Sequence, residues 1–231
     1  MSEMSTPSAA TPPAMPSPLR LITTLGLIAM LSGFTIVLIY QVTLEPIARN
    51  HREALERAVF EVLPGAVSRA NFTVIDQELI RLSDEELAAA DLFAGFDEDG
   101  NLIGVALEAA SRGYAGEIRV LFGYAPDREK IIGFTVLQSS ETPGLGDKIE
   151  TDPRFLANFE ALDVRLDETG EALANPIQPV PEGAKTQPWE IDGITGATVS
   201  AVAVARALRE STETWVPLIF AHQDELAEES E

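Results

Sequence analysis

A four-residue turn at 195–198, Thr-Gly-Ala-Thr, has the residue types and position best suited to chemistry in this sequence. It runs directly into an Ala-rich stretch, 199–211, that contains no glycine or proline and is predicted to be a helix. The first N–H groups of a helix have no intrahelical acceptor and carry the positive end of the helix dipole, so they hold anions such as phosphate. Thr198 is expected at or near the N-cap, with its hydroxyl available.

The same turn also fits simple capping of a structural helix, which needs no ligand. It is not a Walker loop, because the Gly-Lys-Ser/Thr ending is missing. Nor is it a dinucleotide-binding fingerprint, which requires three glycines at fixed spacing after a strand. The residues of the turn therefore leave anion binding and plain capping both open.

Two further Gly-rich segments lie upstream, at 111–118 (SRGYAGEI) and 140–150 (SETPGLGDKIE). In the second, Pro143 stiffens the loop, while Gly144 and Gly146 allow backbone conformations closed to other residues. Such a loop can bring its backbone close to a flat ligand. A turn that ends a strand is equally typical of this pattern.

Composition excludes several classes of chemistry. The chain has no cysteine, which rules out disulfides, thiolate metal sites, cysteine-ligated iron–sulfur clusters and cysteine nucleophiles. Its two histidines, His51 and His222, are far apart in sequence, so no metal site is expected. The net charge of −21 makes nucleic-acid binding improbable and otherwise favours solubility. Redox chemistry in this chain would require an organic cofactor.

The elements that must position the Gly-rich segments are both helices and strands. Helical spacing of apolar residues predicts a helix over 45–62 that ends at Leu63-Pro64-Gly65. Turn and strand signals predict the remaining elements: a strand or hairpin at 71–82, a turn at 97–101 before a strand at 102–110, a hairpin of 117–125 with 130–138, a short helix at 152–162 and a loop at 166–189. Because no regular βαβ alternation is visible, we predict an α+β fold.

The N-terminal part contains a stretch of about 20 uncharged, mostly apolar residues, 21–40, long enough to cross a bilayer of about 30 Å. A cleaved signal peptide is the alternative, but its apolar region is usually shorter and no clear cleavage site follows. Charge does not fix the orientation. One arginine precedes the span and three follow it, a distribution that taken alone places the following domain in the cytoplasm.

These observations divide the chain into five predicted parts. They are a disordered tail (1–18), a transmembrane anchor (19–42), a stalk helix (43–66), a single folded domain (67–214) and an acidic tail (215–231).

The three Gly-rich segments, taken in order, resemble one known family. The stretch from Asp192 to Thr198 matches the Asp-x-x-Ser/Thr-Gly-Ala-Thr flavinylation motif of FMN-binding domains, and ETPGLG at 141–146 resembles the loop near the flavin in those domains. With GYAGEI upstream and one N-terminal span, the chain resembles the G subunits of Rnf/Rsx ion-translocating electron transport complexes. It is less similar to the C subunits of Na⁺-translocating NADH:quinone reductases.

The resemblance implies a covalent flavin site. In that family a flavin transferase takes FAD and joins FMN through its phosphate to the last threonine of the motif, here Thr198. Flavin contacts are expected from the other residues of the three segments: Gly113, Tyr114, Glu141, Thr142, Pro143, Gly144, Leu145, Gly146, Lys148, Thr195, Gly196 and Ala197. Of these, Tyr114 and Leu145 also fit core positions, and Lys148 also fits a solvated surface. No catalytic residue of the chain's own is expected.

The resemblance further implies a single-pass protein of the plasma (inner) membrane whose FMN-binding domain is extracytoplasmic, in the periplasm. Its expected partners are membrane lipid, a flavin transferase and the other subunits of a complex that couples electron transfer between ferredoxin and NAD to ion transport. Two alternatives remain open: a flavinylated component of another extracytoplasmic reductase, and an assembly protein without a cofactor.

Overall fold

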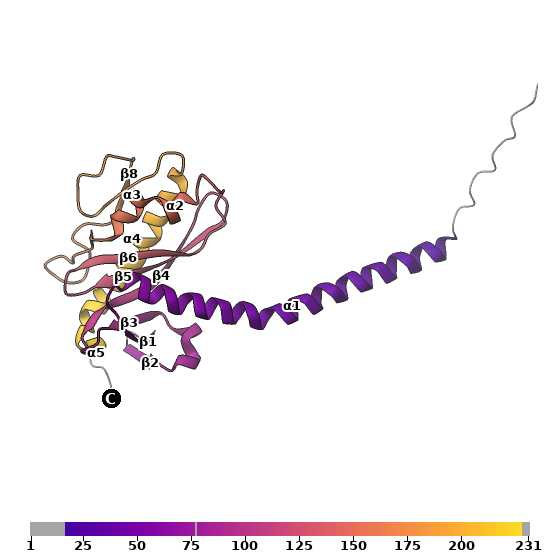
Figure 1. Cartoon of the computed structure of the whole chain (residues 1–231), viewed down its shortest axis with the longest axis horizontal. Helices are drawn as coiled ribbons and strands as arrows, with labels where there is room; N and C mark the ends of the chain where they lie inside the picture. The colour runs from indigo at the N-terminus through magenta and orange to yellow at the C-terminus, as the bar shows by residue number, and fades with distance from the viewer. Residues whose placement is uncertain (1–16, 77, 228–231) are drawn as a thin grey trace, which may run out of the picture. The chain divides into compact units, whose positions relative to one another are not determined.

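The computed structural model describes residues 17–76 and 78–227, so most of the predicted tail at 1–18 lies outside the described residues. The chain divides into two units, Met1–Asn50 and His51–Glu231. The elements, in order (Figure 1), are α1 (Pro18–Val62), β1 (Ser68–Ile75), β2 (Glu78–Leu82), the 3₁₀ helix η1 (Asp84–Ala89), β3 (Leu92–Phe96), β4 (Leu102–Arg112), β5 (Glu117–Ala125), β6 (Lys130–Gln138), α2 (Lys148–Thr151), α3 (Pro153–Leu156), the 3₁₀ helix η2 (Ala157–Phe159), β7 (Leu162–Asp163), β8 (Gln178–Val180), β9 (Glu190–Asp192), α4 (Thr198–Ala221) and α5 (Gln223–Ala227).

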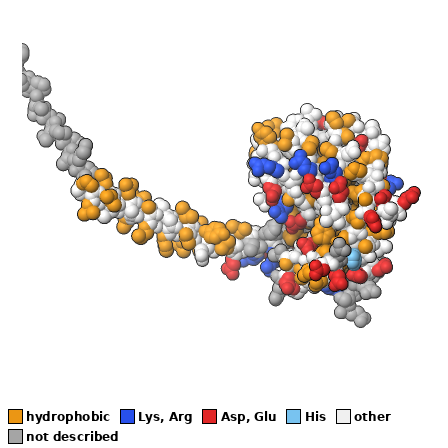
Figure 2. Space-filling model, turned by 180° about the vertical axis from the view of Figure 1, so that it is seen from behind, with side chains coloured by type: hydrophobic (Ala, Val, Ile, Leu, Met, Phe, Trp, Pro, Cys, Tyr) orange, Lys and Arg blue, Asp and Glu red, His pale blue; other side chains and the backbone are white. Residues whose placement is uncertain are grey.

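The described part of the first unit is the N-terminal part of α1, whose apolar side chains are exposed along the helix (Figure 2). Among the described residues, α1 is the one helix long and apolar enough to cross a membrane. Its threonines satisfy their hydroxyls within the helix; Thr24 and Thr35, for example, donate to carbonyls four residues earlier at 2.7 and 2.8 Å. Such internal pairing is what an apolar surrounding demands. The predicted span at 19–42 lies inside this helix, which continues without a break through Pro46.

The second unit is built on a seven-stranded antiparallel sheet with the strand order β2-β1-β3-β4-β5-β6-β7. The predicted hairpin of 117–125 with 130–138 is present as β5 and β6, and the segment at 71–82, predicted to be a strand or a hairpin, lies in the hairpin of β1 and β2. A separate two-stranded parallel sheet joins β8 to β9 within a region predicted to be mostly loop. The α+β prediction is confirmed.

Helices cover both faces of the sheet, and the alternation of side chains along the central strands shows this directly. In β5, Val120 and Phe122 belong to the main core, on the face that α4 contacts. Leu121, between them, belongs to a second cluster that includes Val59 and Val62 at the end of α1. Because successive strand residues point to opposite faces, β5 is apolar at nearly every position.

The end of α1 approaches the second face of the sheet at two glycines. A Cβ atom on Gly123 or Gly133 would collide with the Val62 carbonyl. These strands therefore need glycine at the two positions where the helix backbone lies against them. This close packing joins the last turns of α1 to the domain.

The C-terminal part differs from the sequence prediction. Helix α4 was expected to end near residue 211 and an acidic tail to begin at 215, but α4 continues to Ala221 and α5 follows. Proline in a helix interior costs about 3 kcal/mol, and Pro217 lies inside α4. Val216, Ile219 and Leu226 are fully buried, and each such side chain stabilises by about 1.5–3 kcal/mol, so burial outweighs the proline.

Candidate functional site

Helix α4 begins with a tight turn whose geometry requires glycine. The Ala197 N–H donates to the Ile194 carbonyl at 3.0 Å, which closes a β-turn with Gly196 at its third position and at φ +86°. A positive φ at that position is typical of a type II turn. Ala197 is the N-cap and Thr198 is the first helical residue, so Thr198 lies next to the cap, as expected.

The start of α4 has free hydrogen-bonding capacity and an exposed hydroxyl beside it. Ala197 has no side chain that could accept from the N–H groups of the first turn, and no side-chain cap bond is formed. Those groups have no intrahelical acceptor either. Thr198 is exposed, whereas Ser200 is 2 % exposed. This end of α4 can hold an anion next to the Thr198 hydroxyl.

The loop at 141–146 uses the same kind of turn. The Leu145 N–H donates to the Thr142 carbonyl at 3.1 Å, with Pro143 second and Gly144 third in the turn. Gly144 has φ +78°, and proline at the second position is common in type II turns. Leu145, which follows, is left 51 % exposed.

Glu141 connects the three Gly-rich segments. Its side chain is buried, and one carboxylate oxygen accepts a 2.5 Å hydrogen bond from the Ser200 hydroxyl in the first turn of α4. The other accepts from the Ala115 N–H, in the β4–β5 hairpin, at 3.0 Å. Gly113 and Gly146 lie so close to this carboxylate that a Cβ atom on either would collide with it. One buried side chain thus fixes the two loops relative to α4.

The ionised form of Glu141 is favoured in the folded protein. Burial acts to raise the pKa of its carboxyl, but the hydrogen bond from Ser200 and those from the backbone at Tyr114, Ala115 and Gly116 outweigh burial. The pKa consequently lies below its ordinary value. A carboxylate that accepts several hydrogen bonds is a structural anchor, with little capacity left for proton transfer.

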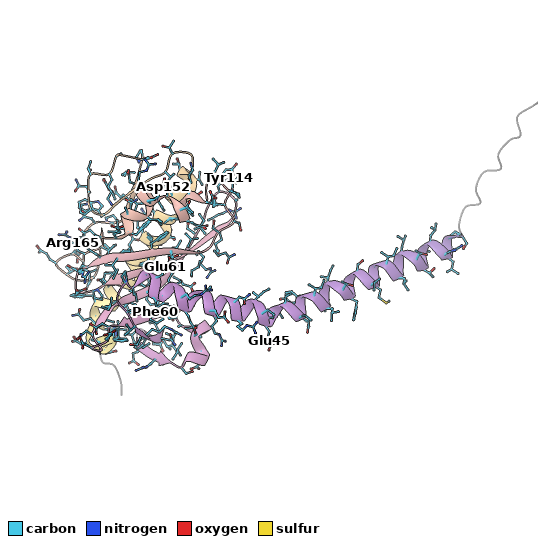
Figure 3. All side chains as sticks on the ribbon, viewed as in Figure 1. Glu45, Phe60, Glu61, Tyr114, Asp152 and Arg165 are labelled. Atoms are coloured by element: carbon cyan, nitrogen blue, oxygen red, sulfur yellow. The ribbon has the colours of Figure 1, made fainter. Side chains whose placement is uncertain are left out.

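The three segments enclose a cavity of about 360 Å³ at the start of α4, which we call the Tyr114 cavity. Tyr114, at the end of the β4–β5 hairpin, is 76 % exposed (Figure 3). Leu145 and Val199 are each about half exposed. The lining residues are Tyr114, Glu141, Thr142, Leu145, Gly146, Gly196, Ala197, Thr198, Val199 and Ser200.

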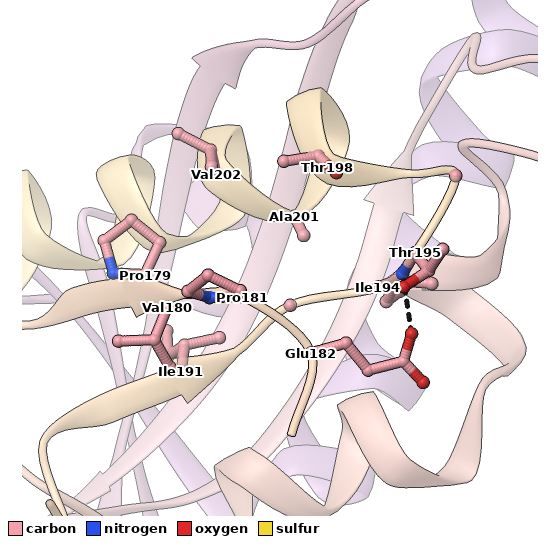
Figure 4. Close-up of a pocket in the computed structure, with 12 residues that line it drawn as sticks. Pro179, Val180, Pro181, Glu182, Ile191, Ile194, Thr195, Thr198, Ala201 and Val202 are labelled. Atoms are coloured by element: carbon pink, nitrogen blue, oxygen red, sulfur yellow. Dashed lines mark hydrogen bonds between the residues drawn. The ribbon is translucent and has the colours of Figure 1, made fainter. Parts of the chain in front are cut away.

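A second cavity of about 350 Å³ adjoins the same threonine, and we call it the Val180 cavity (Figure 4). Ala201 and Val202, three and four residues after Thr198, share its face of α4 and form one wall. The lining residues are Pro179, Val180, Pro181, Glu182, Ile191, Gly193, Ile194, Thr195, Gly196, Thr198, Ala201 and Val202. Sequence reasoning missed this cavity, because its far wall comes from the Pro-rich stretch predicted to be loop.

Glu182, one of the lining residues of the Val180 cavity, is fixed by two partners. Its carboxylate accepts the Thr195 N–H at 2.9 Å and pairs with Arg154 at 2.8 Å. The hydrogen bonds from Thr195 are the main reason why the pKa of Glu182 lies below its ordinary value.

Asp192, the first residue of the 192–198 motif, organises the neighbouring loop. Its carboxylate accepts from the N–H groups of Gly183 and Ala184 at 2.9 and 3.2 Å. The backbone of Asp192 is held by the buried Asn158 amide, which both accepts from its N–H and donates to its carbonyl. Asn158 is a positioning residue that the sequence did not reveal, since no local pattern links it to a residue 34 positions later.

The predicted site residues divide into three groups. Eight line the Tyr114 cavity: Tyr114, Glu141, Thr142, Leu145, Gly146, Gly196, Ala197 and Thr198. Thr195 lines the Val180 cavity, which Gly196 and Thr198 also border. The remaining four lie outside both linings: Gly113 contacts Glu141, Pro143 and Gly144 shape the turn, and Lys148 is half-buried at the start of α2.

Within residues 17–76 and 78–227, no group of three or more His, Asp or Glu side chains is arranged to hold a metal ion. The chemistry available here is an exposed hydroxyl at a helix start, two mainly apolar cavities beside it and a buried carboxylate that stabilises one of them. That arrangement suits a flat ring system joined through a phosphate.

Comparison with known proteins agrees with this geometry. Residues 113–213 match the family described as FMN-binding domain. The chain is 29 % identical over 195 residues to the G subunit of the ion-translocating oxidoreductase complex of Methanosarcina acetivorans, covering 84 % of this chain and 92 % of that protein. It is 35 % identical to the Cereibacter sphaeroides protein of the same name over 153 residues, 64 % of this chain and 68 % of that one.

Among solved structures, the fold is similar to that of the C subunit of the Na⁺-translocating NADH-quinone reductase from Parabacteroides distasonis. The TM-score is 0.59 at 17 % identity, over 74 % of this chain and 94 % of that one. At this level of identity the similarity concerns the fold alone.

Proposed function

Because the chain belongs to the family of G subunits of ion-translocating oxidoreductase complexes, we propose that it is a membrane-anchored electron-transfer protein that carries FMN on Thr198. The flavin phosphate is joined to the Thr198 hydroxyl as an ester. The observation that carries this proposal is the exposed position of Thr198 as the first residue of an α4 that lacks a capping side chain.

The residues present fit this cofactor. A phosphate on Thr198 lies at the positive end of a 24-residue helix, next to N–H groups that have no intrahelical acceptor. The Tyr114 cavity provides an aromatic side chain and a leucine against which a flat ring can pack. FMN, when bound, supplies the capacity to accept electrons from one redox centre and pass them to another.

The protein's own residues hold the segments around the cofactor site in place. Glu141 holds the β4–β5 hairpin and the 141–146 loop against α4, and Asp192 fixes the segment that leads to the turn. Each side chain acts through hydrogen bonds within the protein, which is why we assign neither of them a catalytic role. The ester keeps the cofactor on the protein where free FMN is scarce.

We further propose how the protein is placed in the cell. Residues 19–42 form the membrane anchor, 43–66 the stalk and the segment from 67 onward the FMN-binding domain, which lies in the periplasm. A flavin transferase is the maturation partner, and the functional partners are the other subunits of a complex that links ferredoxin and NAD to ion transport. The periplasmic placement rests on the family resemblance.

The test is co-expression of the full chain with a flavin transferase, followed by in-gel flavin fluorescence and intact-mass measurement. We expect a fluorescent band and a mass increase of one FMN less one water. Thr198→Ala should remove both.

Two neighbouring hydroxyls provide matched controls. Thr195→Ala keeps an exposed hydroxyl at 198, and Ser200→Ala removes a hydroxyl that is already engaged by Glu141. Ser200→Ala should remain able to take up flavin, whereas Thr195→Ala alters the motif itself and is expected to take up less, with any attached flavin still on Thr198. Full fluorescence in Thr198→Ala would contradict the attachment site, and a colourless wild-type chain would favour an assembly protein without a cofactor.

A further inference from the structure

Thr198 and Gly196 line both the Tyr114 cavity and the Val180 cavity, so the two cavities meet at these residues. Val199 and Ser200 turn toward the Tyr114 cavity, whereas Ala201 and Val202 form a wall of the Val180 cavity. A group attached to the Thr198 hydroxyl therefore has two recesses within reach of one tether.

Either cavity can hold one flat ring system. Their volumes, about 350 and 360 Å³, lie at the lower end of the range typical of small-molecule sites. Neither has room for a second ligand of that size.

Both cavities can hold a neutral aromatic ring, and they do so through different contacts. The Tyr114 cavity offers an exposed aromatic ring and the Leu145 side chain. The Val180 cavity offers mainly aliphatic walls, from Pro179, Val180 and Ile194 among others, and its acidic lining residue, Glu182, is already engaged by Thr195 and Arg154. A tethered ring that can enter either cavity occupies each one according to its free energy there.

We propose that the flavin ring attached at Thr198 has two resting places, the Tyr114 cavity and the Val180 cavity, and exchanges between them about its phosphate tether. This inference rests on the proposed function. Exchange between the two cavities would place the flavin ring in two positions without movement of the folded domain. An electron carrier with two positions can approach a donor from one and an acceptor from the other.

The absence of cysteine from the chain makes the test direct, because an introduced thiol is the only one present. Val180→Cys places a thiol on the wall of the Val180 cavity opposite α4, and Thr142→Cys places one in the Tyr114 cavity. Glu210→Cys is the control, exposed on α4 and about 18 Å along the helix from Thr198. For each full-length variant, the rate of alkylation is measured with flavin attached and without it.

We expect attached flavin to slow alkylation of the thiol in each cavity, but to block neither reaction completely. A ring divided equally between the cavities slows each thiol about twofold, because each is covered half of the time. The Glu210→Cys thiol should react at the same rate in both forms.

A second substitution tests whether the two sites exchange one ring. Val202→Phe fills part of the Val180 cavity from its α4 wall, so in the Thr142→Cys background it should increase the protection that flavin gives. Val202→Met is the milder variant if phenylalanine prevents folding. The flavin-free form of each double variant corrects for direct effects on the thiol.

The outcomes separate this inference from the proposed function. If intact mass shows no flavin on the wild-type chain, the proposed function fails. If flavin is attached but protects only one of the two cavity thiols, the proposed function stands and the second resting place is overturned. Protection of both thiols without redistribution in the Val202 variants also overturns the exchange.

Discussion

The hydroxyl of Ser200 donates a 2.5 Å hydrogen bond to the carboxylate of Glu141, and these two residues are 59 positions apart in the sequence. Both side chains are buried, and the bond joins the first turn of α4 to the 141–146 loop. The same carboxylate reaches the β4–β5 hairpin through Ala115. The shape of the Tyr114 cavity depends on this one acidic side chain.

Replacing Glu141 by glutamine should therefore destabilise the protein and disturb the site. Hydrogen bonds to charged groups contribute about 1.5–3 kcal/mol, so we expect the free energy of unfolding to fall by about 2 kcal/mol. Denaturant unfolding of Glu141→Gln measures this directly. Ser200→Ala should cost less, since the carboxylate keeps its backbone donors.

A double-mutant cycle with Glu141→Gln and Ser200→Ala isolates the bond itself. We expect a coupling free energy of about 1 kcal/mol or more. Strict additivity of the two single changes would mean that the bond contributes nothing to stability.

The contribution of Glu141 should depend on pH in a defined direction. Its pKa is lowered in the folded protein, so its stabilisation is fully present above the unfolded-state pKa of about 4.3. The stabilisation is lost as the pH falls from there through the lower folded-state pKa. The stability difference between wild type and Glu141→Gln should be constant near neutral pH and shrink in acid; a difference that grows in acid would contradict this assignment.

Gly146 should tolerate no side chain, because a Cβ atom there would meet Glu141 and Ser200. We expect Gly146→Ala to cost about 1–3 kcal/mol, as overpacking does, and to reduce flavin uptake in the co-expression assay. Gly144→Ala is the matched control. Its Cβ meets open space, but its φ of +78° costs about 1–2 kcal/mol, so stability should fall while flavin uptake persists.

The junction between α1 and the sheet depends on Gly133 in β6. Any Cβ atom at this position would collide with the Val62 carbonyl, so Gly133→Val should displace the end of α1 and lower stability by at least about 2 kcal/mol. Thermal unfolding of the full chain in detergent measures the effect. Gly116→Ala, whose Cβ would meet only the Ser140 side chain at 3.2 Å, is the comparison and should cost less.

Local patterns predicted most of the elements but not the contacts between them. Two strand-like runs on either side of a turn located β5 and β6, and an Ala-rich stretch without glycine or proline located the start of α4 within a residue. The end of α4 was misplaced, because the sequence prediction assigned residues 215–231 to an acidic tail although residues 215–221 are apolar. Only tertiary burial of Val216 and Ile219 explains why the helix continues.

In the candidate site, too, local features could be predicted from the sequence but contacts between distant residues could not. The glycines and prolines of the Gly-rich segments were recognisable, since turns impose local backbone requirements that the sequence displays. Other features join residues far apart in the chain. They are the hydrogen bond between Glu141 and Ser200, the hydrogen bonds between Asn158 and the backbone of Asp192, and the lining of the Val180 cavity. No local spacing encodes such contacts, and they became visible only when the fold was known.

The most direct measurement is fragmentation mass spectrometry of the tryptic peptide 186–206 from protein matured with a flavin transferase. This peptide lies between Lys185 and Arg206 and contains Thr195, Thr198 and Ser200 together. We predict that the added mass of FMN less one water begins at Thr198 and is absent from fragments that end before it. Flavin mass on any other residue, or an unmodified peptide from fully matured protein, would contradict the assignment of Thr198 as the attachment site.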